Sequence, residues 1–374
     1  MNKNPLSLAC EICDCIISGN EVQQLEPIRK KWFYAHALFM CGLQRLYELT
    51  SDVKYLEYTK EWADSKIDEN GEFYFKNECI EGTDYPCFCP QLDSVQPGLP
   101  LFKLYEIYGE GKYRKAIENL YQFLLTAPTT SDGGYYHYWY MNKFPSQMWL
   151  DGLYMAEPFT MEYYLLNREE KCLDMIWKQI RLMTEHNLDE NTGLLYHGWD
   201  ESKNAKWADK ETGRSKEFWG RSIGWYCVTL ADILEEFPKD RGEYQKMLQM
   251  FLNIIDSVIH YQDKSGLWFQ VIDKASEKDN WTESSCTCLF LYSLSKGLRL
   301  GLLSKKYEQF ADSAYNGVLS VVKKDGNKYL MENISTGVNV GDYDYYVGAR
   351  KSNSDLHGIG SLILALTEYS KIKQ

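Results

Sequence analysis

The sequence predicts an all-α protein in which six helical hairpins close into a toroid, and two observations carry this prediction. Apolar residues recur at helical spacing through nearly every long segment, whereas strand patterns are confined to short pieces. Polar glycine turns that run into an aromatic residue also recur, with their central glycines 60 to 73 residues apart, at Gly71, Gly133, Gly193, Gly266 and Gly326. A period near sixty residues fits two helices with their connections, and 374 residues divided by six give about 62.

The apolar periodicity predicts a dozen helices along the chain. They are expected near residues 5 to 19, 30 to 49, 53 to 66, 94 to 108, 112 to 126, 152 to 166, 170 to 185, 219 to 236, 244 to 261, 282 to 301, 305 to 322 and 354 to 371. The first helix should pair with the last one or cap the end of the assembly. No tract rich in Pro, Gly or Ser interrupts the pattern, so residues 1–374 are expected to form one domain.

Conspicuous polar and aromatic clusters follow the same period. Each cluster stands at or near the start of the first helix of a hairpin, and a ring of hairpins makes these first helices parallel. All their N-termini then meet at one end, in a cleft whose helix dipoles favour anions. The clusters are Trp32-Phe33-Tyr34, Asp93, Asp151, Trp219-Gly220-Arg221, Glu283-Ser284-Ser285 and Asp355-Leu356-His357-Gly358.

Composition excludes several classes of partner. The net charge of −12 argues against a nucleic acid or an anionic membrane surface, because both need basic patches. A small anionic substrate stays compatible with this charge where a local Arg or Lys overrides the overall field. Aromatic residues make up 15% of the chain, and ring faces suit a cleft that stacks on sugars.

Location and cofactor content are also constrained by the sequence. Glu11 and Asp14 interrupt any apolar core of a signal peptide, and no stretch reaches the length of a transmembrane helix. The eleven cysteines are odd in number and scattered, as expected of reduced thiols in a cytoplasmic protein. The three Cys-x-Cys pairs lack a nearby His or second pair, so no metal is expected. Dinucleotide, Walker-type and Gly-x-Ser-x-Gly motifs are absent, and no cofactor is expected.

Asp151 is the first catalytic candidate, because it stands in the largely apolar and aromatic run from Phe144 to Phe159. In such surroundings a carboxylate is either capped and paired, or its pKa rises and it becomes a general acid. The simpler interpretation is a cap on the helix that opens at Gly152. Asp93 lies one repeat earlier and, taken alone, is also typical of a cap. The ring would place the two carboxylates side by side, where each raises the other's pKa and the pair titrates together.

Four further residues are candidates for substrate binding. His197 follows a glycine turn between Tyr196 and Trp199, and it fits either a structural role or a hydrogen bond to substrate. Arg221 and Trp225 share one face of a helix start, close to Trp219. They fit either a buried Trp with a solvated Arg, or a carboxylate clamp beside a stacking platform.

These residues carry a family resemblance. The motif Gln147-Met148-Trp149-Leu150-Asp151-Gly152-Leu153-Tyr154-Met155 resembles the unsaturated rhamnogalacturonyl hydrolases of glycoside hydrolase family 105, over about residues 30 to 370. The supporting segments are Leu92-Asp93, Tyr196-His197-Gly198-Trp199-Asp200, Trp219-Gly220-Arg221-Ser222-Ile223-Gly224-Trp225 and Lys296-Gly297-Leu298-Arg299-Leu300-Gly301.

The resemblance implies an (α/α)6 barrel and a reaction. The family removes a 4,5-unsaturated uronic acid from the non-reducing end of pectin oligosaccharides left by a polysaccharide lyase. Asp151 would be the general acid and base and Asp93 its carboxylate neighbour. His197, Trp219, Arg221 and Trp225 would contact a small anionic oligosaccharide, and the protein would act as a monomer or homodimer.

One departure and two rival functions remain. Family members often carry a His-Lys pair shortly before the central motif, whereas an ungapped count here reaches Tyr140-Met141; His137 and Lys143 correspond only if the loop has an insertion.

Sugar 2-epimerases also use this barrel, but they rely on paired histidines and the chain has six His in all. A non-catalytic sugar-binding barrel would keep the aromatic residues and lose the acid.

Overall fold

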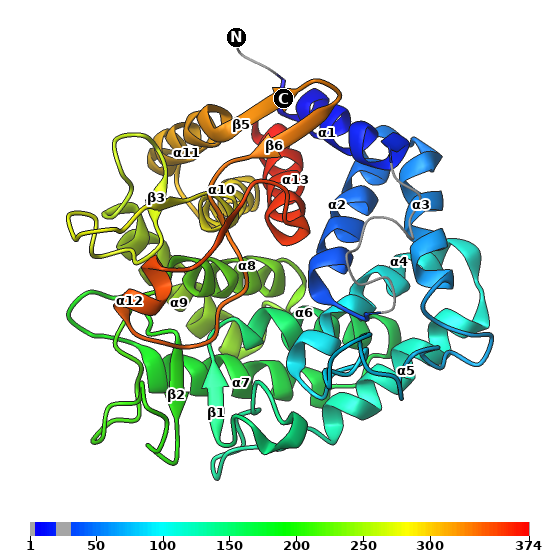
Figure 1. The fold of residues 1–374 in the computed structure, drawn as a ribbon, viewed down its shortest axis with the longest axis horizontal. Coiled ribbons are helices and arrows are strands. Elements are labelled where there is room, and N and C mark those ends of the chain that lie inside the picture. Colours follow the sequence, from blue (N-terminus) through cyan, green and yellow to red (C-terminus); the bar gives the residue numbers. More distant parts are fainter. Residues whose placement is uncertain (1–3, 20–30, 374) are drawn as a thin grey trace.

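The computed structural model describes residues 4–19 and 31–373. Six inner helices follow one another around a central axis, an arrangement that can be followed in Figure 1. Each contacts the next one around the axis, and the last contacts the first, which closes the ring. These inner helices are α2 (Tyr34–Thr50), α4 (Leu99–Tyr108), α6 (Gly152–Asn167), α8 (Gly220–Glu236), α10 (Ser284–Arg299) and α13 (Leu356–Ile372).

A second layer of helices surrounds the first. Five of these outer helices follow their inner partner in sequence, and α1 packs against α13, as one of the two predicted arrangements had it. They are α1 (Pro5–Gly19), α3 (Val53–Asp64), α5 (Gly111–Leu125), α7 (Lys171–Asn187), α9 (Gly242–Ile259) and α11 (Glu308–Val321). The prediction of an all-α toroid, an (α/α)6 barrel, is therefore confirmed.

The two layers differ in burial, and the sequence explains why. An inner helix touches neighbours on all sides: every residue of α10 from Ser284 to Gly297 is buried. An outer helix buries one stripe, and the buried residues of α9 recur three or four positions apart from Tyr244 to Val258. A helix that is buried on all sides lies inside and one with a single buried stripe lies outside. Small polar residues as well as apolar ones fill the buried surface of α10.

Some predicted boundaries differ from the structure. The helix expected over 94 to 108 begins as two 3-10 turns, η2 (Leu92–Ser94) and η3 (Gln96–Gly98), and α4 starts only at Leu99. Pro97 lacks an N–H group, which disfavours a continuous α-helix there. The helix expected from residue 30 begins at Tyr34, and residue 30 itself lies outside the described residues. The short helix α12 (Tyr343–Val347) was not predicted, and η4 (Tyr140–Asn142) and η5 (Lys305–Tyr307) are further 3-10 turns.

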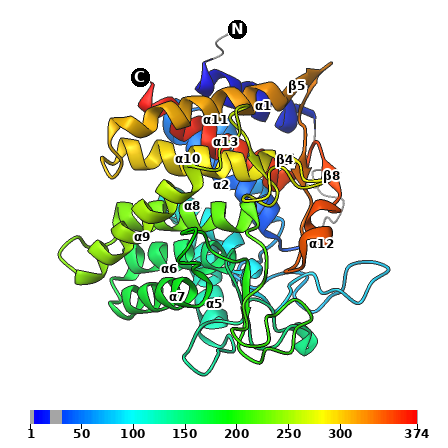
Figure 2. The same ribbon diagram turned by 90° about the vertical axis from the view of Figure 1, so that its left-hand side faces the viewer.

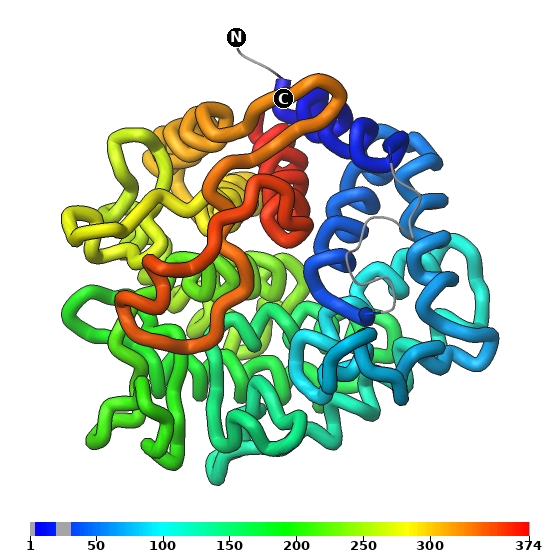
Figure 3. Tube along the Cα trace, viewed as in Figure 1, coloured from blue at the N-terminus to red at the C-terminus, as the bar shows by residue number. Residues whose placement is uncertain are grey.

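Strands occur only as short antiparallel pairs, as predicted, within the described residues. Figure 2 shows β4, β8 and α12 at the same end of the ring, where the inner helices begin. The chain between β6 and α13, which contains α12, crosses the open face of the ring at this end (Figure 3). The pairs are β1 (Gln147–Trp149) with β2 (Gly198–Asp200), β3 (Trp268–Phe269) with β4 (Thr282–Glu283), β5 (Val322–Asp325) with β6 (Lys328–Met331), and β7 (Ile334–Ser335) with β8 (Lys351–Ser352).

The glycine turns that set the repeat have a common conformational cause. All five central glycines have positive φ angles, a conformation that residues with a side chain rarely adopt. At Gly266 a Cβ atom would also lie 2.0 Å from the carbonyl oxygen of Ser313. The period that predicts the fold is therefore a period of turns that require glycine.

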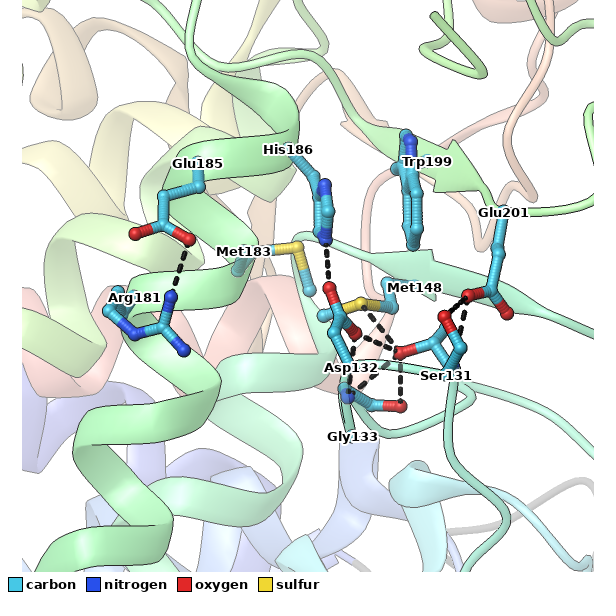
Figure 4. A network of polar contacts seen from close by, with 12 residues as sticks. Ser131, Asp132, Gly133, Met148, Arg181, Met183, Glu185, His186, Trp199 and Glu201 are labelled. Carbon is cyan, nitrogen blue, oxygen red and sulfur yellow. Dashed lines mark hydrogen bonds and ion pairs between the residues drawn. The ribbon is translucent and has the colours of Figure 1, made fainter.

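A polar network fastens the β1–β2 pair to the turn before it (Figure 4). The His186 Nε2 atom lies 2.7 Å from Asp132 Oδ2, and the His186 ring stacks on Trp199 of β2 with centroids 3.6 Å apart. The Ser131 N–H donates to Glu201, just after β2, over 2.9 Å. These contacts hold the outer side of the strand pair whose inner end leads to Asp151.

Candidate active site

Backbone hydrogen bonds bring together three segments that are far apart in sequence. The Leu92 N–H donates to the carbonyl of His137, and the His137 N–H donates to the carbonyl of Gln147, each over 2.9 Å. The Leu150 N–H then donates to the carbonyl of His197 over 2.8 Å. The residues that follow Leu92 and Leu150 are Asp93 and Asp151. This ladder places both carboxylates and both imidazoles at the N-terminal end of the ring.

Asp151 does not cap α6. It precedes the helix with φ −66° and ψ −21°, and its side chain makes no capping hydrogen bond, so the simpler interpretation of this residue is wrong. Its Oδ1 atom instead lies 3.3 Å from His197 Nε2. His197 is fully buried, and its Nδ1 atom lies 2.7 Å from the Tyr346 hydroxyl. The Tyr346 hydroxyl accepts a hydrogen bond from the Gly341 N–H over 3.1 Å and donates its own proton to His197 Nδ1. In this tautomer the Nε2 atom of His197 carries the ring proton and donates it to Asp151.

The second carboxylate has its own imidazole. Asp93 Oδ1 lies 3.3 Å from His137 Nε2, and His137 is buried while its ring stacks on Trp149 with centroids 4.5 Å apart. Burial favours the neutral ring, but the charges of Asp151 and Asp93 outweigh it and raise the pKa of His137. His137 is therefore the proton-holding group between the two carboxylates.

The protonation state expected for Asp151 needs correction. The apolar sequence around it predicted a raised pKa, and burial does act in that direction. The charge of His137 and the hydrogen bond from His197 act more strongly and lower the pKa of Asp151 to about 2. Burial lowers the pKa of His197, which stays neutral. In the ligand-free site Asp151 is thus a carboxylate, next to an imidazole, His137, whose pKa is raised.

Arg221 is buried beside this group and is 2% exposed. Its Nη1 atom donates to the carbonyl of Ser335 and lies 2.7 Å from His357 Nε2, and its Nη2 atom donates to the carbonyl of Thr336 over 3.0 Å. The His357 Nδ1 atom lies 2.7 Å from Asp355 Oδ1, so the imidazole links the guanidinium to this carboxylate. Among the described residues no carboxylate lies within ion-pair distance of Arg221, so its buried charge lacks a direct acidic partner.

The two candidate tryptophans are both buried. Trp219 is 2% exposed, and the Arg221 Cζ atom lies 4.6 Å from the centroid of its ring. The Trp219 ring also contacts the His197 ring, with centroids 4.5 Å apart. Trp225 lies deeper in the barrel and stacks on Tyr154 with centroids 4.2 Å apart. The structure therefore brings Asp93, Asp151 and His197 together, with Trp219 and Arg221 beside them, whereas Trp225 belongs to the packed interior. Their substrate contacts remain predictions.

Two further residues lie in this group: the sequence left the place of His137 open, and it did not indicate Tyr346. His137 stands four residues after Gly133, as His197 stands four residues after Gly193, so alignment of the repeats could have found it. Tyr346 has no such signal, because the segment that carries it lies outside the repeat. Lys143 is exposed, with its ammonium 5.2 Å from the Phe144 ring.

In residues 4–19 and 31–373, no three His, Cys, Asp or Glu side chains lie close enough to hold a metal ion. No helix in the same part of the chain combines the length and apolar character that a membrane crossing requires.

Comparison with known proteins fits this fold and site. The sequence profile of Glycosyl Hydrolase Family 88 matches residues 11–373. A family 105 glycoside hydrolase of C. acetobutylicum superimposes with a TM-score of 0.87 and 32% identity, over 97% of this chain and 99% of that one. The unsaturated rhamnogalacturonyl hydrolase YesR of Bacillus subtilis is 23% identical over 302 residues, 79% of this chain and 77% of the relative. An unsaturated glucuronyl hydrolase of Bacillus sp. GL1 has the same fold, with a TM-score of 0.72, 13% identity and coverage of 98% and 96%.

The profile match and the family 105 structure identify the protein as a glycoside hydrolase. The chain belongs to the family that the Glycosyl Hydrolase Family 88 profile describes, and its 32% identity to the family 105 enzyme over 97% of its length supports membership of family 105. Membership of this family argues against the two alternative functions considered from the sequence, a sugar 2-epimerase and a non-catalytic sugar-binding barrel.

Proposed function

We propose that the protein removes a 4,5-unsaturated galacturonic acid from the non-reducing end of rhamnogalacturonan oligosaccharides. The observation that carries this proposal is the arrangement of Asp151. It is a half-buried carboxylate that accepts from a neutral imidazole, His197, and lies close to a second imidazole, His137, whose pKa is raised. This group can give a proton to an electron-rich double bond and later take one from water.

The first step is proton donation to C4 of the vinyl ether. In the ligand-free site the proton resides on His137, and Asp151 is ionised. A substrate that brings its own carboxylate into this low-dielectric site raises the pKa of Asp151 and favours its protonated form. Asp151 then delivers the proton to C4, and an oxocarbenium-like cation forms at C5. Asp93 keeps the His137 imidazolium in place through their 3.3 Å contact.

The second step is addition of water. Asp151, again a carboxylate, takes a proton from a water molecule that attacks C5, and the resulting hemiketal collapses and expels the aglycone. The reaction needs no nucleophile at the anomeric carbon, so the carboxylate spacings that distinguish retaining from inverting glycosidases do not apply. His197 holds the Asp151 carboxylate in a fixed orientation through both steps.

Arg221 is proposed to attract the uronate carboxylate. Its guanidinium is buried without a carboxylate in direct contact among the described residues, so the site carries a positive charge that an incoming anion would balance. Trp219 holds the guanidinium plane from below. The parallel N-termini of the inner helices add to the attraction.

The identity of the substrate is tested with two lyase digests. Unsaturated oligosaccharides from rhamnogalacturonan and from a glycosaminoglycan both absorb ultraviolet light through their conjugated double bond, and hydration abolishes that absorbance. The proposal expects loss of absorbance with the first digest at a rate at least tenfold above the second. Faster turnover of the glycosaminoglycan digest would move the protein to glucuronyl substrates, and no loss with either would end the proposal.

A further inference from the structure

A cavity of about 520 Å³ lies at the opposite end of the ring from Asp151. Its walls include the C-terminal halves of several inner helices, with Glu162 of α6 and Asp232, Glu235 and Glu236 of α8, and they extend inward as far as Tyr154 of α6. Glu162 lies eleven positions after Asp151, which corresponds to about 16 Å along the helix axis. The candidate active-site residues described above do not line the cavity, so the cavity is distinct from that site. Its volume lies within the range of small-molecule sites.

The charges that line the cavity balance only in part. Each of its three cations already has an acidic partner in the wall. The Lys296 ammonium lies 2.6 Å from Asp232 and 2.7 Å from Glu235. The other pairs are Arg45 with Glu48 at 3.1 Å, and Lys103 with Glu48 at 3.2 Å and with Glu106 at 2.8 Å.

Two carboxylates remain without an ion pair to any described residue. Glu162 and Glu236 both line the cavity, from neighbouring helices, and neither lies within 4 Å of a cationic side chain in the described chain. Burial raises the pKa of Glu162, the charges of Arg45 and Lys103 lower it in part, and the charges of Glu236 and Asp232 raise it further. The negative ends of the parallel inner helices point toward the same space. The cavity thus favours a ligand with positive charge.

Tyr154 supplies a second, independent indication of a ligand. It lines the cavity and is 3% exposed, yet its hydroxyl has no hydrogen-bond partner among the described residues. Its ring is fixed by stacking on Trp225. Buried tyrosine hydroxyls usually find a partner, so this one is placed to bond a bound molecule. Phe102 and Tyr292 add aromatic surface to the wall, which suits an alkylammonium group.

We propose that this cavity binds an aliphatic diamine or polyamine. Two unpaired carboxylates on adjacent helices match two ammonium groups joined by an alkyl chain, and the Tyr154 hydroxyl accepts from one of them. A single metal ion fits less well, because no three ligating side chains converge anywhere in the described chain. The bound diamine would bridge α6 and α8 at the end of the ring that lacks the strand pairs.

Calorimetric titration of the full-length protein with 1,4-diaminobutane tests the proposal. The wild type should bind it, and butylamine, which has one ammonium, should bind at least tenfold more weakly. Glu162→Gln and Glu236→Gln should each weaken diamine binding at least tenfold, and Tyr154→Phe severalfold. Glu236 is exposed, so its variant keeps the test valid if replacement of Glu162 or Tyr154 impairs folding, as circular dichroism would reveal.

Two controls locate the binding. Glu190→Gln removes an exposed carboxylate from a turn outside the cavity and should leave the affinity within twofold. Asp151→Asn should also leave it unchanged, which separates this cavity from the candidate active site. The proposal is overturned by an absence of diamine binding, by equal affinity for butylamine, or by a loss of affinity in Asp151→Asn with none in Glu236→Gln. None of these readouts depends on hydrolase activity.

Discussion

Replacement of Asp151 by Asn should separate catalysis from stability, because the side chain makes no capping hydrogen bond that the change would break. The amide oxygen of Asn can still accept from His197, and only the charge is lost. The pKa of Asp151 falls from 3.8 to about 2, so the carboxylate contributes at most about 2 kcal/mol to folding at neutral pH. That contribution is present above pH 3.8 and is lost as the pH falls through about 2. The melting temperature should drop by less than about 8 °C.

The expected loss of activity is much larger than this loss of stability. Asp151 acts once as acid and once as base, so the variant should lose at least about a thousandfold in kcat, which corresponds to about 4 kcal/mol of transition-state stabilisation. The assay is the decay of ultraviolet absorbance on lyase-digested rhamnogalacturonan, with calorimetric melting of the same preparation. A variant that turns over within tenfold of wild type would refute the role assigned to Asp151, whatever its melting temperature.

Three further predictions concern the groups around this carboxylate. His137→Gln should lower kcat at least about a hundredfold and remove the alkaline limb of the pH–rate profile. Because the pKa of His137 is raised above 6.5, its protonated form and the stability that this form contributes are fully present below pH 6.5. Both are lost as the pH rises through the raised pKa of His137. An unchanged alkaline limb in the variant would contradict this role. Tyr346→Phe should lower kcat about tenfold with little change in KM, because it frees His197 to rotate; a purely structural role would lower the melting temperature and leave kcat unchanged. Arg221→Lys should weaken substrate binding by about 1 to 3 kcal/mol, and an unchanged KM and kcat would remove Arg221 from the site.

The fold could be predicted because its determinants are local and periodic. The five glycine turns occur where positive φ angles are needed, and the difference between all-round and one-sided apolar helices sorts the layers. The break before α4 and the helix α12 were harder to predict, since Pro97 is compatible with a helix start and α12 lies outside the repeat. That residues 1–374 form one domain stays a prediction, which a single cooperative unfolding transition would support.

The sequence could predict that Asp93, Asp151 and His197 lie near one another, but not the protonation of Asp151; their roles in a site stay a prediction. The repeat brings Asp93, Asp151 and His197 to one end of the ring, and a ladder of backbone hydrogen bonds confirms that they meet. The apolar sequence around Asp151 suggested a protonated acid, because the imidazole beside it comes from a loop fourteen residues earlier. The charge of His137 and the hydrogen bond from His197 together lower the pKa of Asp151 more than burial raises it. Tyr346 could not be found, because it reaches the site from a segment with no periodic signal.

The incorporation of deuterium at C4 is the most direct test of the proposed hydration. The reaction is run in deuterated water, and the released sugar is examined by NMR at early times. Unlabelled product placed in the same solvent measures exchange that the enzyme does not catalyse. Proton donation by Asp151 predicts deuterium on one face of C4 together with loss of the ultraviolet absorbance. A released sugar that keeps its double bond and absorbance, or one without enzymatic deuterium at C4, would contradict it.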